Sequence, residues 1–284
     1  MRARMTSFAI SRAGAIAVAR TNRRLRRALP TAAQIWLLLV GSVIVGIGAA
    51  ITLSTGLGAG PFDVLLTGLS NRTGLPFAGA LWACAGVLML IAAGLGNRPG
   101  PGTIVAPMII GPVVQVMLGP LAGIRPTGSL EVAHWMWLGT AQLIGVAMIG
   151  VGAGAMIVSG LGAGTGDLLA AATSSRLGRP TALIRTLLEL AFLGIGLTLG
   201  GRAGVGTVLV AMTIGQSVAF GHRQVELLVA GLITPLTRLR RAVGRSVASL
   251  GADGKILEGA GRVNARFLRK TEHPLAHDVP QDLV

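Results

Sequence analysis

Two aspartates are the residues of this sequence best placed to do chemistry. Asp63 follows the string Gly-Leu-Gly-Ala-Gly-Pro-Phe, and Asp167 follows Gly-Leu-Gly-Ala-Gly-Thr-Gly. The glycines permit a tight backbone break, after which a new helix can begin. The unpaired N–H groups and positive dipole of a helix start stabilise a carboxylate in the first turn. The aspartates are therefore either helix caps or ligands for a proton, a cation or a small solute.

Further polar residues extend this candidate site. Thr103 and Thr207 each follow a glycine at the start of an apolar segment, where threonine caps a helix. Arg185 and Glu189 stand four residues apart, so they can pair on one helix face or line one half of a pathway. The full candidate set is Gly58, Gly60, Asp63, Thr103, Gly162, Gly164, Asp167, Arg185, Glu189 and Thr207.

The elements that position these residues must lie in a membrane. The chain has 284 residues, of which 52% are hydrophobic and 12% charged, whereas a soluble domain carries about 25% charged residues. This composition excludes an ordinary soluble protein and a disordered one. A single cysteine, Cys84, excludes an internal disulfide, and no histidines have metal-ligand spacing within an apolar segment. We therefore predict no metal and no cofactor.

Apolar segments predict an all-α polytopic bundle. A transmembrane helix needs about 20 mostly apolar residues. Two further segments, 61–71 and 165–175, make only about 16 Å of helix each, about half of a bilayer. We predict that they are re-entrant half-helices. The six predicted spans are residues 33–53, 75–95, 103–121, 135–158, 181–199 and 205–221.

The sequence repeats itself with an offset of 104 residues. Gly56 to Asp63 recurs as Gly160 to Asp167, and Arg72 and Pro76 recur without a gap as Arg176 and Pro180. The bias toward glycine and alanine does not explain matched aspartate, arginine and proline. We predict two homologous repeats, each with three transmembrane helices and one half-helix.

At these motifs the chain resembles a known family. The segments GLGAGPFDVLLTGLS and GTIVAPMIIGP are similar to those of the bacterial YczE/YyaS/YitT membrane proteins, over roughly residues 34–222. The resemblance implies an integral protein of the bacterial inner membrane, and it implies no particular substrate or reaction.

The number of crossings decides how the repeats are related. Three spans per repeat make the second repeat inverted, as in many secondary transporters. Four spans per repeat, with the half-helices crossing, make the repeats parallel. Positive charges in the loops favour eight crossings, whereas the lengths of the segments favour six. We predict six.

Positive charge gathers in the two tails. Residues 1–30 carry eight arginines and no acidic residue, which places this end in the cytoplasm, and an even number of crossings places the other end there too. The tails can also touch anionic lipid head groups. Because the arginines flank apolar spans, we expect no nucleic-acid partner; a homo-oligomer is possible. The predicted divisions are a basic arm 1–32, repeat 33–121, connecting loop 122–134, repeat 135–222, amphipathic basic helix 223–250 and cytoplasmic tail 251–284.

Three functions fit these patterns. The first is a secondary transporter or permease-like protein for a small solute, with the two half-helix starts forming the central site. The second is a membrane scaffold or accessory protein that holds partners with its basic tails. The third is an intramembrane aspartyl peptidase, suggested by Gly164-Thr-Gly-Asp167. Since the repeat already explains both aspartates, we expect no enzyme.

Overall fold

The computed structural model describes residues 29–124, 132–162 and 164–232. It forms two compact units, Met1–Ala230 and Gly231–Val284, and the helical bundle belongs to the first. The predicted arm 1–32, connecting loop 122–134, basic helix 223–250 and tail 251–284 lie wholly or partly outside the described residues.

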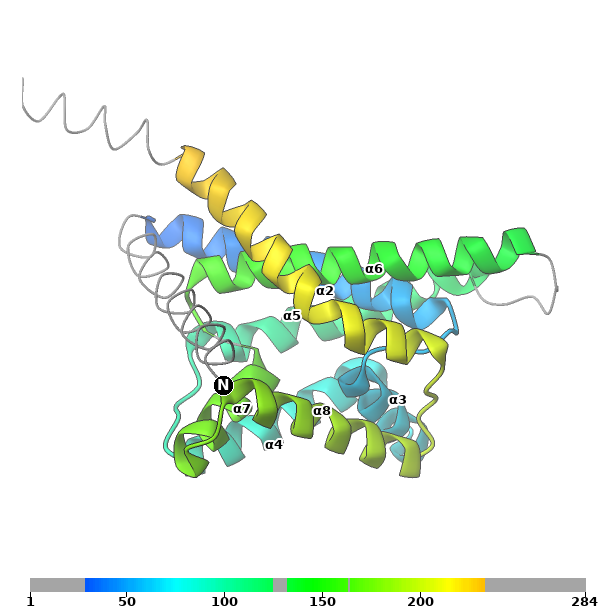
Figure 1. Cartoon of the computed structure of the whole chain (residues 1–284), viewed down its shortest axis with the longest axis horizontal. Helices are drawn as coiled ribbons and strands as arrows, with labels where there is room; N and C mark the ends of the chain where they lie inside the picture. The colour runs from blue at the N-terminus through cyan, green and yellow to red at the C-terminus, as the bar shows by residue number, and fades with distance from the viewer. Residues whose placement is uncertain (1–28, 125–131, 163, 233–284) are drawn as a thin grey trace, which may run out of the picture. The chain divides into compact units, whose positions relative to one another are not determined.

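All regular structure in the described residues is helical (Figure 1). The last described helix, Val205–Leu232, carries no label in Figure 1 and is called the last helix. The other elements are α2 (Thr31–Ser54), α3 (Pro61–Thr73), α4 (Phe77–Gly94), α5 (Pro101–Leu118), the short 3-10 helix η1 (Pro120–Ile124), α6 (Val132–Ser159), α7 (Thr165–Leu177) and α8 (Thr181–Thr198).

Six of these helices are long and apolar enough to cross a membrane: α2, α4, α5, α6, α8 and the last helix. The prediction of an all-α protein with six apolar helices of spanning length is thus confirmed in the described residues. α3 and α7 have 13 residues each, or about 20 Å of helix, which is shorter than a hydrocarbon core of about 30 Å.

The helix bounds recur with the offset of the sequence repeat. α3 begins at Pro61 and α7 at Thr165, and α4 and α8 likewise begin and end 104 residues apart. Each half-helix starts after a glycine and stops at a glycine with left-handed backbone, Gly74 at φ 73° and Gly178 at φ 63°. The glycines that break the sequence pattern therefore also set the helix ends.

α2 and α6 form a close antiparallel pair. Gly48 lies against Gly145 and Gly41 against Gly152. Residue numbers therefore rise along α2 as they fall along α6, which makes the two helices antiparallel. A Cβ atom added to Gly48 would stand 2.6 Å from the carbonyl oxygen of Gly145. Only glycine allows this approach, and small residues are the usual means of packing helices in lipid.

The remaining helices pack around this pair. α5 lies on α2, where Gly46 meets Val113, and the last helix lies on α6, where Gly150 meets Ser217. α3 packs on α8 and α7 packs on α4, and these four helices lie in the lower part of Figure 1, below α2 and α6. Each half-helix thus contacts a long helix from the other half of the chain.

The last helix differs from its predicted bounds. The span was expected to end at Gly221, but the helix continues to Leu232. Gly221 packs against the backbone of Gly150, so it serves a helix contact and does not end the helix. The sequence has no proline between Gly221 and Pro235 that would end the helix earlier.

Candidate functional site

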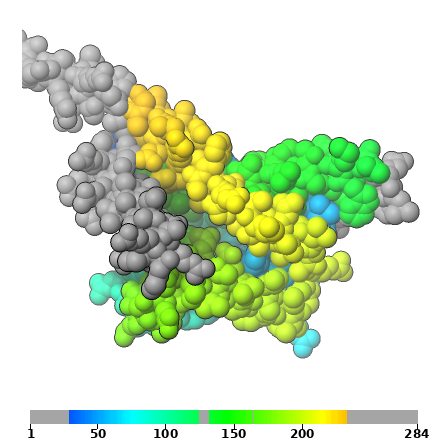
Figure 2. Space-filling model, in the orientation of Figure 1, coloured from blue at the N-terminus to red at the C-terminus, as the bar shows by residue number. Residues whose placement is uncertain are grey.

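The starts of both half-helices lie on one cavity of about 250 Å³. Gly60 to Asp63 line it from α3, and Gly164 and Thr165 line it from α7. α8 contributes Arg185 and Glu189. Figure 2 shows the surface hollowed between the last helix and α8, both of which line the cavity. The rest of the wall is mainly apolar and includes Val45, Ala49, Leu66, Phe77, Leu81, Ile110, Ile149 and Val210.

A second cavity of about 280 Å³ adjoins the first. It shares Phe62, Gly164, Arg185 and Glu189 with the first cavity, and it adds Asp167. The two aspartates therefore open into neighbouring spaces that have a common wall. Four of the predicted site residues of the second half, Gly164, Asp167, Arg185 and Glu189, are brought together here.

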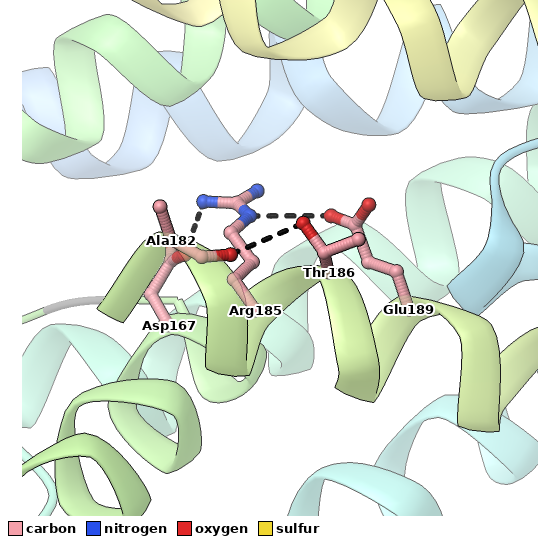
Figure 3. A network of polar contacts seen from close by, with 5 residues as sticks. All are labelled: Asp167, Ala182, Arg185, Thr186 and Glu189. Atoms are coloured by element: carbon pink, nitrogen blue, oxygen red, sulfur yellow. Dashed lines mark hydrogen bonds and ion pairs between the residues drawn. The ribbon is translucent and has the colours of Figure 1, made fainter. Parts of the chain in front are cut away.

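Arg185 is held between two carboxylates (Figure 3). Its Nη1 atom pairs with Oδ1 of Asp167 on α7, and its Nε atom donates to Oε1 of Glu189 at 3.2 Å. The pair with Glu189 follows from the spacing of four residues along α8. The pair with Asp167 links α7 to α8, and sequence spacing did not predict it.

Asp63 has a different environment. Its carboxylate lies close to the backbone of Gly60, the residue that precedes α3: a Cβ atom added to Gly60 would stand 3.2 Å from Oδ2 of Asp63. At this place a carboxylate can stabilise the unpaired N–H groups of the helix start. Asp63 makes no ion pair with any described residue. Leu81 and Ala85 occupy the positions that match Arg185 and Glu189, so this half of the chain lacks the arginine.

The glycine-rich break before each of α3 and α7 is hydrogen-bonded to the start of a long helix in the other half of the chain. The break before α3 contacts the last helix, and the break before α7 contacts α5. The N–H of Gly206 donates to the carbonyl of Leu57 at 2.8 Å, and the N–H of Gly102 donates to that of Leu161 at 3.0 Å. The two contacts are equivalent under the offset of 104 residues.

Thr103 and Thr207 lie at these contacts, and both are buried. Gly58 and Gly162 lie against Thr207 and Thr103, respectively. Thr103 lines the cavity beside the half-helix starts. Thr207 is buried against Gly58, and its hydroxyl accepts a hydrogen bond from the N–H of Gly204 at 3.2 Å, which caps the last helix.

Gln142 supports the first break, a role that the sequence pattern does not predict. Its side chain is fully buried. It donates to the carbonyl of Gly58 at 2.9 Å and accepts from the hydroxyl of Thr55 at 2.7 Å. In the sequence, Gln142 is only a glutamine within an apolar segment, and nothing there identifies Thr55 and Gly58 as its hydrogen-bond partners.

The described residues contain no group of three His, Cys, Asp or Glu side chains able to hold a metal ion. The charged groups that line the two cavities are three carboxylates and one guanidinium, and the two helix starts add polar backbone.

Comparison with known proteins places the chain among membrane proteins. The profile of a family of unknown function (DUF6198) matches residues 5–119. An uncharacterized protein of Haemophilus influenzae is 30% identical over 184 residues, which cover 65% of this chain and 81% of the relative. No solved structure matches the chain.

Two Bacillus subtilis proteins are also similar to this chain. The uncharacterized membrane protein YczE is 28% identical over 188 residues, which cover 65% of this chain and 83% of YczE. The uncharacterized protein YyaS is 29% identical over 173 residues, which cover 60% of this chain and 83% of YyaS. With these relatives and six apolar helices of spanning length, the chain belongs to the YczE/YyaS family of membrane proteins.

Proposed function

We propose that this protein is a secondary transporter for a small solute in the bacterial inner membrane, with both termini in the cytoplasm. The observation that carries the proposal is the cavity onto which both half-helix starts open. Broken helices that meet at a site inside the membrane are characteristic of transporters built from repeats.

We also propose that the two halves are inverted repeats. The antiparallel packing of α2 and α6 supports this relation, because these helices match under the offset of 104 residues. The match of Gly41 is Gly145, which touches Gly48, and the match of Gly48 is Gly152, which touches Gly41. Parallel repeats would instead make α2 and α6 cross in the same direction.

Contacts at the ends of the half-helices support a re-entrant course. The break before α3 is bonded to Gly206, and near the end of α3 the side chain of Asn71 donates to the carbonyl of Gly200 at 3.1 Å. Both partners lie between the end of α8 and the first turn of the last helix, so α3 leaves and returns on one side of the membrane.

α7 makes the corresponding contacts with the other half of the chain. The break before α7 is bonded to Gly102, and Nε of Arg176 donates to the carbonyl of Leu95 at 3.3 Å. These partners lie between the end of α4 and the first turn of α5. In the inverted arrangement α7 therefore leaves and returns on the opposite side, and rocking of one half against the other would expose the cavity to each side in turn.

The proposal gives the aspartates no catalytic role. An aspartyl peptidase needs two carboxyl groups that share a proton. The carboxylate of Asp167 is instead paired with the guanidinium of Arg185.

A labelling experiment tests alternating access without knowledge of the solute. Ile110, which lines both cavities, is replaced by cysteine in a Cys84→Ala background. Right-side-out and inside-out membrane vesicles are treated with a membrane-impermeant thiol reagent. We expect labelling from both sides, because the cavity closes toward one side of the membrane when it opens toward the other. The control is Leu90→Cys on the exposed face of α4, which we expect to be labelled from neither side.

Labelling of the Ile110 position from one side only, or from neither side, would contradict the proposal. A second assay measures uptake of labelled amines, amino acids and carboxylates into proteoliposomes. Uptake that is unchanged when Asp63→Asn and Asp167→Asn are combined would also contradict it.

A further inference from the structure

The cavity has more negative than positive charge. Asp63, Asp167 and Glu189 face it or its neighbour, and Arg185 is the one cation among the described residues that line the two spaces. A carboxylate at membrane depth is costly unless it is paired. Arg185 offsets part of that cost for Asp167 and Glu189, whereas Asp63 makes no ion pair with a described residue and lies beside the backbone of Gly60.

The two halves differ at the place where a cation would sit. In the second half the guanidinium of Arg185 lies beside the aspartate at the half-helix start. In the first half the matching residue is Leu81, which lines the same cavity as Asp63. The protein therefore supplies its own cation to Asp167, whereas Asp63, on a cavity that Arg185 also lines, makes no ion pair with a described residue.

The wall selects the kind of cation. Phe62, Leu66, Phe77 and Leu81 line the same cavity as Asp63. Apolar groups cannot replace the hydration shell of an inorganic ion, whereas they pack well against an alkyl chain. Aromatic faces also attract ammonium and guanidinium groups. The cavity volume of about 250 Å³ lies below the range of about 300–1,000 Å³ of pockets that bind drug-sized ligands, so the cavity suits a smaller molecule.

We infer that the cavity binds a small organic cation, an ammonium or guanidinium group on a short apolar body, with Asp63 as its counter-ion. The inference deepens the proposed function by naming the class of solute. The two helix starts do not favour an anion, because each already carries its own aspartate in the first turn.

The test is isothermal titration of the purified full-length protein in detergent. The probes are n-butylammonium chloride, sodium butyrate and sodium chloride, which separate an organic cation from an organic anion and from an inorganic cation. We expect binding of n-butylammonium alone. Asp63→Asn should weaken it by about 10- to 100-fold, the range for loss of a charged hydrogen-bond partner.

Asp167→Asn is the matched control, because Asp167 occupies the same position in the other half-helix but is already paired. It should weaken binding less than Asp63→Asn does. Leu81→Arg should abolish binding, because a tethered guanidinium would take the place of the ligand. Since Leu81 is buried, the fold of this variant is checked by gel filtration, and Asp63→Asn carries the test if it does not fold.

Butyrate or sodium binding in place of the amine would overturn the inference. So would amine binding that Asp63→Asn leaves unchanged, or the absence of heat with every probe. None of these outcomes alters the labelling of Ile110→Cys from the two sides, so failure of the cation site and failure of the transport proposal are distinguishable.

Discussion

The close contact between α2 and α6 predicts a sharp difference between two glycine-to-alanine substitutions. The first is Gly48→Ala, whose new Cβ would stand 2.6 Å from the carbonyl oxygen of Gly145 and 2.9 Å from the nitrogen of Ile149. The control is Gly86→Ala in the interior of α4, where an added Cβ would have no neighbour within 4 Å.

The structure sets the size of the expected difference. An ordinary contact begins at about 3.4 Å, so α2 and α6 must separate by about 0.8 Å at Gly48, and overpacking of this kind costs about 1–3 kcal/mol. Both substitutions gain up to about 1 kcal/mol of helix propensity, which cancels in the comparison. Gly48→Ala should therefore be less stable than Gly86→Ala by about 1–3 kcal/mol.

The assay is unfolding by sodium dodecyl sulfate in mixed micelles, followed by the fluorescence of the four tryptophans. Gly152→Ala provides an internal check, because Gly152 is the match of Gly48 and an added Cβ would stand 2.6 Å from the carbonyl oxygen of Gly41. It should lose a similar amount of stability. Equal stability of Gly48→Ala and Gly86→Ala would refute the close antiparallel pair.

Three further predictions use the same unfolding assay. Gly58→Ala should be more destabilising than Gly74→Ala, although both backbones are left-handed (φ 112° and 73°), because only at Gly58 would the new Cβ also meet the start of the last helix; equal losses would contradict this contact. Gln142→Leu should cost about 1–3 kcal/mol, because it leaves the carbonyl of Gly58 without its donor; no loss would mean that the break does not depend on Gln142. Arg185→Gln should lower stability, and adding Glu189→Gln should restore part of the loss, because fewer carboxylates then lie without a cation; a further loss in the double variant would argue against this charge balance.

Much of the helical framework could be predicted from the sequence. Pro61 and Thr165 were predicted to start the half-helices, and the structure starts α3 and α7 at these residues. Local signals sufficed, because Gly60 and Gly164 directly precede the helices and Gly74 and Gly178 end them. The last helix runs on to Leu232, past Gly221 where the span was predicted to end, and Gly221 serves a helix contact.

The candidate site was only partly predictable. Four residues separate Arg185 from Glu189, which fixes their pairing on one helix face. Arg185 and Asp167 lie on different helices, so their contact depends on how α7 crosses α8, which no spacing in the sequence determines. The bonds from Gln142 to Thr55 and Gly58 likewise depend on the packing of α6 against the end of α2.

The most direct test of the inverted repeats with re-entrant half-helices is their topology. Single cysteines are placed at Arg72, Arg98, Arg176 and Arg202 in a Cys84→Ala background, and intact cells are treated with a membrane-impermeant thiol reagent. Inverted repeats predict labelling at 72 and 202 and none at 98 and 176, because matching positions then lie on opposite sides. Labelling at 98 and 202, with none at 72 and 176, would mean eight crossings and parallel repeats, and would contradict the proposed central site.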